Sequence, residues 1–96
     1  MRISIIVPCY NEQEALPLFY EEITDVLQKL GESYEVILVN DGSSDQTLAE
    51  MRKLAEKDPH IVYLSFSRNF GKEAAMYAGF CNAKGEYVAV MDADLQ

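Results

Sequence analysis

The sequence contains no apolar run long enough to cross a membrane and no N-terminal stretch long enough for a secretion signal. Its first apolar run, Ile3 to Val7, is short and is interrupted by Ser4. A membrane-spanning helix needs about 20 apolar residues, and the apolar part of a signal peptide needs about 7 to 15. We therefore expect this run to be a first strand and the chain to be soluble.

Basic residues are also scarce. The chain has 8 lysines and arginines against 16 aspartates and glutamates, which gives a net charge of -8. This balance excludes a general nucleic-acid binder or a binder of anionic membranes, because both need a surface rich in lysine and arginine. It does not exclude a small phosphate ligand held through a divalent cation, since carboxylates bind such cations well.

Cysteines are few, and two common phosphate-binding loops are missing. Cys9 and Cys81 stand alone without metal-ligand spacing, which predicts free thiols in a reducing compartment. No Gly-x-Gly-x-x-Gly motif follows the first apolar run, which argues against a dinucleotide-binding oxidoreductase. The sequence also lacks the Gly-Lys-Ser/Thr motif, which excludes a P-loop nucleotide-binding protein. With 96 residues and no linker or repeat, we expect one domain.

What the sequence does contain is a regular alternation of two patterns. Short β-branched runs predict strands at residues 3–7, 35–40, 61–66 and 87–91. Between them, apolar residues at three- and four-residue spacing predict helices that end near Gly31, Asp58 and Gly85. Strands alternating with helices predict an α/β fold with a parallel sheet, strand order 3-2-1-4, and helices on both faces. In such a sheet, ligands bind beyond the carboxyl ends of the strands, between the first and the fourth.

Two carboxylates follow the last predicted strand, in the segment Asp92-Ala93-Asp94-Leu95-Gln96. Acids two residues apart at a strand end can hold one hard cation, Mg²⁺ or Mn²⁺, with phosphate oxygens and water completing the shell. Gln96 offers a further neutral oxygen. The alternative is a solvated acidic turn, because Asp-x-Asp is a short motif.

Polar residues follow the first and second predicted strands as well. Tyr10 can stack on a nucleobase and Glu12 can hydrogen-bond to it, or else residues 11–14 form a helix capping box with Asn11 as the cap. Asp41 can accept hydrogen bonds from a base or a ribose, or else the segment Asp41-Gly42-Ser43-Ser44 is a turn or a helix cap.

Two basic residues, Arg68 and Lys72, flank the start of the third predicted helix. A basic group opposes the helix dipole at this end, so its placement there indicates an anion nearby. The alternative is an ion pair with one of the many surface carboxylates.

Taken in order, these segments resemble glycosyltransferase family 2, which has a GT-A fold. The resemblance lies in residues 5–12 (Ile-Ile-Val-Pro-Cys-Tyr-Asn-Glu), 39–45 (Val-Asn-Asp-Gly-Ser-Ser-Asp) and 91–94 (Met-Asp-Ala-Asp). Residues 67–75 and 92–96 resemble more specifically the polyprenyl-phosphate branch of that family. That branch includes dolichol-phosphate mannosyltransferases and undecaprenyl-phosphate glucosyl- or aminoarabinosyl-transferases.

The resemblance implies a site for a nucleotide sugar, UDP- or GDP-linked. It implies that the nucleoside pocket is lined by Pro8, Tyr10, Glu12, Val39 and Asp41. It also implies that Asp92 and Ala93 approach the nucleotide. Arg68 and Lys72 match the pattern of the polyprenyl-phosphate branch, and we expect them to contact phosphate.

The resemblance further implies an inverting hexosyl transfer to a polyprenyl phosphate at the cytoplasmic face of the membrane. Asp92, Asp94 and Gln96 would surround the Mg²⁺ or Mn²⁺ ion, and the two aspartates would be catalytic through it. Because the acceptor phosphate is already ionised near neutral pH, a strong general base is not needed.

Members of this family continue for well over a hundred further residues. We therefore expect residues 1–96 to be the N-terminal, nucleotide-sugar-binding part of a GT-A domain, without transferase activity alone. The last strand would then be an unpaired sheet edge, which favours self-association. The alternative function is a non-catalytic nucleotide-binding or regulatory module completed by a partner.

Overall fold

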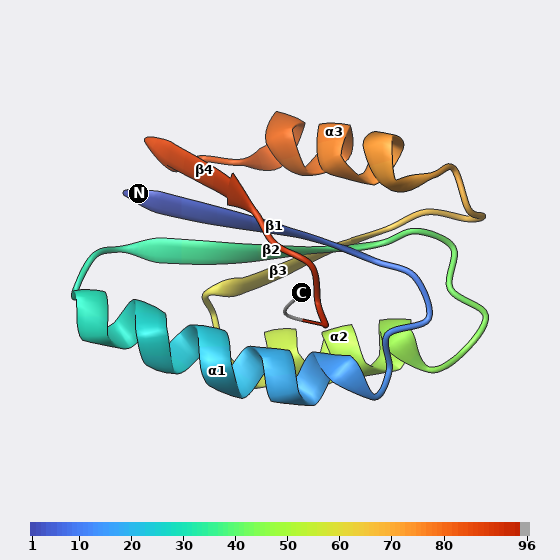
Figure 1. The fold of residues 1–96 in the computed structure, drawn as a ribbon, viewed down its shortest axis with the longest axis horizontal. Coiled ribbons are helices and arrows are strands. Elements are labelled where there is room, and N and C mark those ends of the chain that lie inside the picture. Colours follow the sequence, from blue (N-terminus) through green and yellow to red (C-terminus); the bar gives the residue numbers. More distant parts are fainter. Residues whose placement is uncertain (95–96) are drawn as a thin grey trace.

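The computed structural model describes residues 1–94, which form four parallel strands and three helices in alternation (Figure 1). The strands are β1 (Ile3–Cys9), β2 (Tyr34–Asn40), β3 (Ile61–Ser65) and β4 (Tyr87–Val90). The helices are α1 (Ala15–Leu30), α2 (Thr47–Lys57) and α3 (Lys72–Asn82). The strand order is β3-β2-β1-β4, so the predicted class and order are confirmed.

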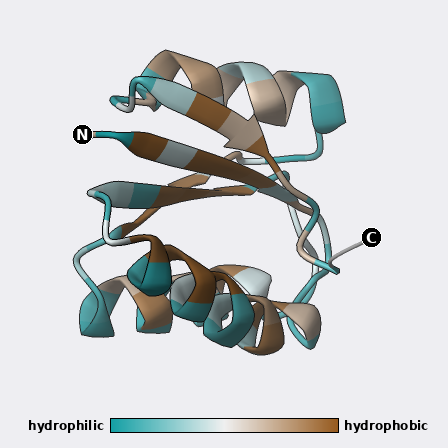
Figure 2. Cartoon of the chain, turned by 60° about the vertical axis from the view of Figure 1, so that its left-hand side comes forward, coloured by the Kyte–Doolittle hydropathy of each residue, from teal (hydrophilic) through white to brown (hydrophobic). Residues whose placement is uncertain are grey.

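Helices cover both faces of the sheet, with α1 and α2 on one face and α3 on the other (Figure 1). The central strand β2 is buried along its whole length, which explains its continuous apolar run. One core cluster lies between the sheet and α1 and α2, and a smaller one lies under α3. Figure 2 shows the hydrophilic residues gathered on the outer sides of α1 and α2, away from the sheet.

The start of α1 differs from the capping box that was one sequence alternative. Pro17 lies in the first turn and Gly31 ends the helix at a φ of 73°, as expected. However, the residue before the helix is Glu14, and it makes no side-chain cap bond. Asn11 has a φ of 54° and lies well before the helix. The capping-box interpretation is therefore wrong, because the side chain of Asn11 is engaged elsewhere.

Strand β1 extends two residues beyond the prediction and includes Pro8. The carbonyl of Ile6 accepts a hydrogen bond from Met91 on the β4 side, whereas the carbonyl of Cys9 accepts one from Asp41 on the β2 side. Because alternate residues bond to opposite neighbours, Pro8 faces the β4 side, beyond the last β1–β4 pair, Ile6 with Val90. Its missing N–H therefore leaves no gap in the sheet.

Helix α3 packs closely on β1 through its small residues, as its sequence predicts. Ala75 is fully buried, and a Cβ placed on Gly79 would lie 2.4 Å from Cγ2 of Ile6. On the outer side of the sheet, β4 is an edge strand, and its residue Tyr87 is 61% exposed. Self-association through this edge stays a prediction. Within residues 1–94, no helix is both long and apolar enough to span a membrane.

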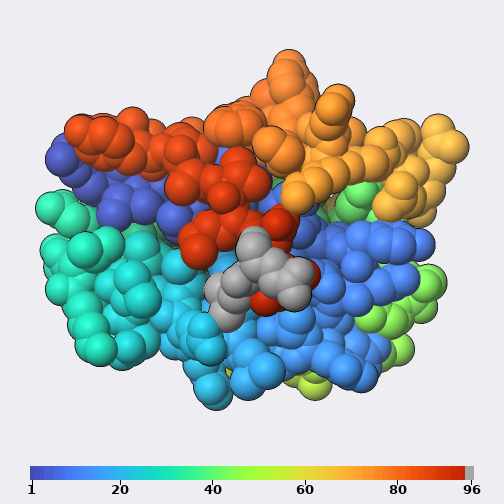
Figure 3. Space-filling view, in the orientation of Figure 1, coloured from blue at the N-terminus to red at the C-terminus, as the bar shows by residue number. Residues whose placement is uncertain are grey.

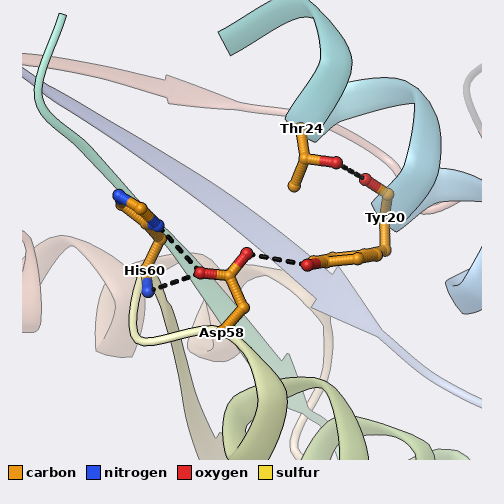
Figure 4. Close-up of polar contacts among 4 residues, drawn as sticks. All are labelled: Tyr20, Thr24, Asp58 and His60. Atoms are coloured by element: carbon orange, nitrogen blue, oxygen red, sulfur yellow. Dashed lines mark hydrogen bonds and ion pairs between the residues drawn. The ribbon is translucent and has the colours of Figure 1, made fainter. Parts of the chain in front are cut away.

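A hydrogen-bonded cluster around Asp58 joins α1 to the start of β3 (Figure 4). It lies at the amino end of β3, whereas the strand-end acids follow the carboxyl ends of the strands. One oxygen of the Asp58 carboxylate accepts a bond from the hydroxyl of Tyr20 at 2.8 Å. The other accepts from the backbone N–H of His60 at 2.9 Å and lies 2.8 Å from Nδ1 of its ring. Burial alone would raise the pKa of Asp58, but the bonds from His60 and Tyr20 outweigh it and lower the pKa below its usual value.

This lowered pKa predicts a pH-dependent effect of Asp58→Asn on stability. A carboxyl whose pKa is lower in the folded state stabilises the fold above its unfolded pKa, about 3.9, and loses that contribution as the pH falls through the folded value. We expect Asp58→Asn to reduce the free energy of unfolding at pH 7 by about 1 to 2 kcal/mol. The reduction should largely disappear once the pH falls below the lowered pKa that Asp58 has in the folded state.

Urea denaturation of both proteins at pH 7 and at low pH measures this difference. Asp25→Asn is the matched control, because Asp25 makes only an exposed ion pair with Lys29 on α1. An Asp58→Asn defect of the same size at both pH values would contradict the prediction.

Candidate functional site

The loops that follow β1, β2 and β4 meet at one edge of the sheet and enclose an open pocket of about 200 Å³. Its lining residues are Pro8, Cys9, Tyr10, Glu12, Asp41, Lys72 and Asp92. All except Cys9 were candidate site residues from the sequence, although their contact with a ligand stays a prediction. In Figure 3 the red segment after β4 lies against the blue surface of the N-terminal residues.

Cys9 is an inert part of this lining. Its side chain is 1% exposed, and its thiol lies 3.4 Å from the carbonyl oxygen of Val7. Burial raises the pKa of the thiol, and the negative charge of Glu12 raises it further. Cys9 therefore stays protonated and packs as a small apolar residue, not as a nucleophile.

Hydrogen bonds join the loop after β1 to the loop after β2. Asn11 donates its backbone N–H to Oγ of Ser43 at 2.9 Å and accepts from the backbone of Ser44 at 2.8 Å. The next residue, Glu12, donates its backbone N–H to the hydroxyl of Thr47 at 2.8 Å. These bonds hold Glu12 at the pocket. The sequence does not predict these bonds directly, and its signals for them are an asparagine, which tolerates positive φ, and a pair of serines.

Asp41 is 4% exposed and holds the loop before α3. One carboxylate oxygen accepts from the backbone of Phe70 at 2.8 Å, and the other accepts from the side-chain amide of Asn69 at 3.2 Å. The backbone of Gly71 donates to both oxygens, at 3.3 and 3.1 Å. We call these four residues the Asp41 clasp.

The clasp corrects the local alternative for Asp41, a turn or a helix cap. Asn40, not Asp41, accepts the turn bond from the backbone of Ser43, at 3.1 Å. At the start of α2, Asp45 accepts from the backbone of Thr47 at 2.9 Å. Burial opposes ionisation of Asp45, but bonds from Thr47 and Gln13 outweigh it and lower its pKa. Asp41 therefore does not cap α2, and its carboxylate binds the loop before α3 instead.

Gly42 allows the clasp to close. A Cβ at this position would lie 2.2 Å from both the carbonyl carbon of Arg68 and the backbone nitrogen of Asn69. The residue also has a φ of 68°, in the left-handed region. The loop before α3 therefore lies directly on the backbone of Gly42, where no side chain fits.

Lys72, the first residue of α3, reaches across the pocket to Asp92. Its Nζ lies 2.8 Å from one carboxylate oxygen, and the two side chains are 59% and 41% exposed. The hydrogen bond and the charge of Asp92 raise the pKa of Lys72. The ion pair that the sequence offered as an alternative is therefore present. Arg68 lies apart from Lys72, because its guanidinium packs 4.6 Å from the centre of the Phe70 ring and does not line the pocket.

Negative charge gathers around this ion pair. Burial raises the pKa of Glu12, and the charges of Asp94, Asp92 and Asp45 raise it further, in that order. Within residues 1–94, no group of three histidines, cysteines, aspartates or glutamates is arranged to hold a metal ion.

A hard divalent cation nevertheless fits this donor set. Mg²⁺ and Mn²⁺ are commonly bound through one or two protein carboxylates, with phosphate oxygens and water supplying the other ligands. Asp92 already holds a cation, the ammonium of Lys72, and Asp94 adds to the negative charge at Glu12. The third predicted metal ligand, Gln96, lies outside the described residues.

Two other predicted site residues are buried in the core. The side chain of Val39 is 0% exposed and belongs to the core cluster under α3. That of Ala93 is 1% exposed and belongs to the cluster beside α1 and α2. Strand alternation turns the side chain of Val39 into the core, and the predicted contact of Val39 with the nucleoside stays a prediction. Only backbone atoms of these two residues remain for a ligand.

Comparison with known proteins gives a close relative in sequence. The chain is 44% identical over 96 residues to the prophage bactoprenol glucosyl transferase homolog of Escherichia coli (strain K12). The match covers 100% of this chain and 31% of that protein. The chain thus spans about three tenths of the length of this relative.

Two solved structures share the fold. The mannosyltransferase PcManGT from Pyrobaculum calidifontis, in complex with GDP-Man and Mn²⁺, superposes with a TM-score of 0.75 at 31% identity, over 97% of this chain and 27% of that chain. S. aureus TarS 1–349 in complex with UDP superposes with a TM-score of 0.78 at 30% identity, over 98% and 28%. The sequence model described as glycosyl transferase family 2 matches residues 4–96, and the chain therefore belongs to that family.

Proposed function

We propose that the pocket binds the nucleoside diphosphate part of a UDP- or GDP-linked hexose together with Mg²⁺ or Mn²⁺. The observation that carries this proposal is the meeting of Glu12, Lys72 and Asp92 around one pocket at the carboxyl ends of β1 and β4. The proposal is supported by the similar structures, which were solved with GDP-Man and Mn²⁺ and with UDP.

The residues that line the pocket offer groups for both parts of a nucleoside diphosphate. Tyr10 is 51% exposed beside Pro8 and offers a ring on which a base can stack. Asp41 lines the same pocket; because its carboxylate already accepts bonds from Asn69, Phe70 and Gly71, a bond from the nucleoside would be an additional one. In the same lining, Lys72 and Asp92 combine a cation and an anion, which suits a diphosphate that carries a metal.

We further propose that the whole protein transfers the hexosyl unit, with inversion, to a polyprenyl phosphate at the cytoplasmic membrane face. The name of the E. coli relative, a bactoprenol glucosyl transferase homolog, supports a polyprenyl acceptor. Asp92 and Asp94 would hold the cation, which supplies Lewis-acid neutralisation of the diphosphate leaving group when bound. Because an acceptor phosphate is already ionised near pH 7, these residues need not supply a base.

Calorimetric titration tests the donor site. We expect UDP or GDP to bind the chain at one saturable site in the presence of Mn²⁺, and to bind far more weakly in EDTA. Equal heats with and without the metal, or no binding of either nucleotide, would contradict the proposal.

The alternative function, a non-catalytic nucleotide-binding module, predicts the same titration. The two functions separate in the full-length protein, through transfer of labelled hexose from the nucleotide sugar to undecaprenyl phosphate. We expect transfer by the full-length protein and none by residues 1–96 alone, since the E. coli relative is about three times as long as this chain. Absence of transfer by the full-length protein would favour the module.

A further inference from the structure

An ion pair at the pocket joins Lys72 to the proposed metal ligand Asp92. The ammonium lies 2.8 Å from the Asp92 carboxylate in surroundings that also contain the charges of Glu12 and Asp94. A cation therefore already neutralises the carboxylate that a divalent metal would need.

The backbone of Lys72 is held firmly, whereas its side chain is free to move. Gly71, the residue before it, donates its backbone N–H to both oxygens of Asp41, and Phe70 donates to one of them. These bonds fix the loop at the start of α3. The Lys72 side chain itself is 59% exposed and makes an ion pair with a partner that is 41% exposed. Exposed ion pairs contribute little net stability, so breaking the pair between Lys72 and Asp92 requires little free energy.

We propose that Lys72 is a displaceable counter-ion, which neutralises Asp92 in the free protein and turns to the diphosphate when a divalent cation takes Asp92. This inference rests on the proposed nucleotide site. A divalent cation bound to Asp92 repels an ammonium at contact distance. The diphosphate that arrives with the cation supplies the released ammonium with new anionic oxygens a short distance away.

Among residues 1–94, Lys72 is the one lysine or arginine that lines the pocket. Arg68 approaches the same helix start, but its guanidinium packs against the ring of Phe70 outside the pocket lining. In an acidic pocket, a diphosphate therefore depends on the cation and on Lys72 for its charge balance. Lys72 thus competes with the metal for Asp92 in the free protein and binds the diphosphate of the nucleotide in the complex.

The variant Lys72→Met separates these two effects, because they have opposite signs. We expect it to bind Mn²⁺ alone about threefold to tenfold more tightly than the wild type, since the competing charge is gone. We expect it to bind UDP in saturating Mn²⁺ about tenfold or more weakly, since a charge-assisted phosphate contact is lost. Mn²⁺ binding is followed by electron paramagnetic resonance, and UDP binding is followed by calorimetry.

Two further variants control the experiment. Lys29→Met removes a similarly exposed lysine paired with Asp25 on α1 and should change neither affinity. Lys72→Arg keeps the charge and should return the affinity for Mn²⁺ alone to the wild-type value. Melting temperatures of all variants, which we expect to agree closely, show that the fold is retained.

Each outcome decides the matter. Unchanged or weaker binding of Mn²⁺ alone by Lys72→Met would overturn the counter-ion role, even if UDP binding also fell. Unchanged UDP binding would overturn the transfer of Lys72 to the diphosphate. A wild-type chain that binds neither Mn²⁺ nor UDP would overturn the proposed function and this inference with it.

Discussion

Replacement of Gly42 by alanine should destabilise the chain by about 3 kcal/mol, the sum expected for a left-handed backbone and a severe overlap. The added Cβ would lie 2.2 Å from two backbone atoms, the carbonyl carbon of Arg68 and the nitrogen of Asn69. Backbone atoms cannot turn aside as the end of a side chain can. The loop before α3 must therefore move away, and the clasp around Asp41 would open with it. Urea denaturation monitored by circular dichroism measures the effect.

Gly31→Ala is the matched control for this prediction. Gly31 has a φ of 73°, close to the 68° of Gly42, but nothing lies within 4 Å of a Cβ placed there. Gly31→Ala should therefore lower the free energy of unfolding only by the cost of backbone strain, about 1 to 2 kcal/mol. The difference between the two variants isolates the close approach of the loop. Equal destabilisation by both would show that the loop does not rest on Gly42.

The fold followed from the sequence because each local signal agreed with the parallel topology. Four β-branched runs separated by amphipathic segments leave little choice other than right-handed crossovers, which place β1 between β2 and β4. The errors lay at the element ends. The pattern before Pro8 predicts a strand that ends at Val7, but β1 continues to Cys9 because Pro8 faces the side of β4 beyond the last pair of these strands.

The residues around the pocket were predictable from their places at strand ends, but their partners were not. Five of the seven lining residues follow β1, β2 or β4 or start α3, and the other two, Pro8 and Cys9, are the last residues of β1, as a strand-end site requires. The clasp was not predictable, because Asp41 binds backbone N–H groups of Phe70 and Gly71, and a backbone donor leaves no trace in the residue type. The resemblance implied that Val39 belongs to the site, but it carried no information on its side chain, which the structure places in the core.

The second large effect concerns Asp92 and the metal. We expect Asp92→Asn to weaken UDP binding in Mn²⁺ by about 100-fold, because an amide replaces the charged ligand. The difference between titrations in Mn²⁺ and in EDTA should nearly vanish. Folding should be little affected, since the Asp92 side chain is 41% exposed and pairs only with an exposed lysine among the contacts that the structure gives.

Asp58→Asn makes the same chemical change at the amino end of β3 and serves as the matched control. It should reduce stability yet leave UDP binding in Mn²⁺ unchanged, because Asp58 bonds to Tyr20 and His60 and not to the pocket. Asp92→Asn should show the reverse, with stability kept and metal-dependent binding lost. The two variants thus separate folding from ligand binding with one kind of substitution. Retention of strong Mn²⁺-dependent UDP binding by Asp92→Asn would place the metal away from Asp92, and the pocket at the end of β4 would then lose its proposed role.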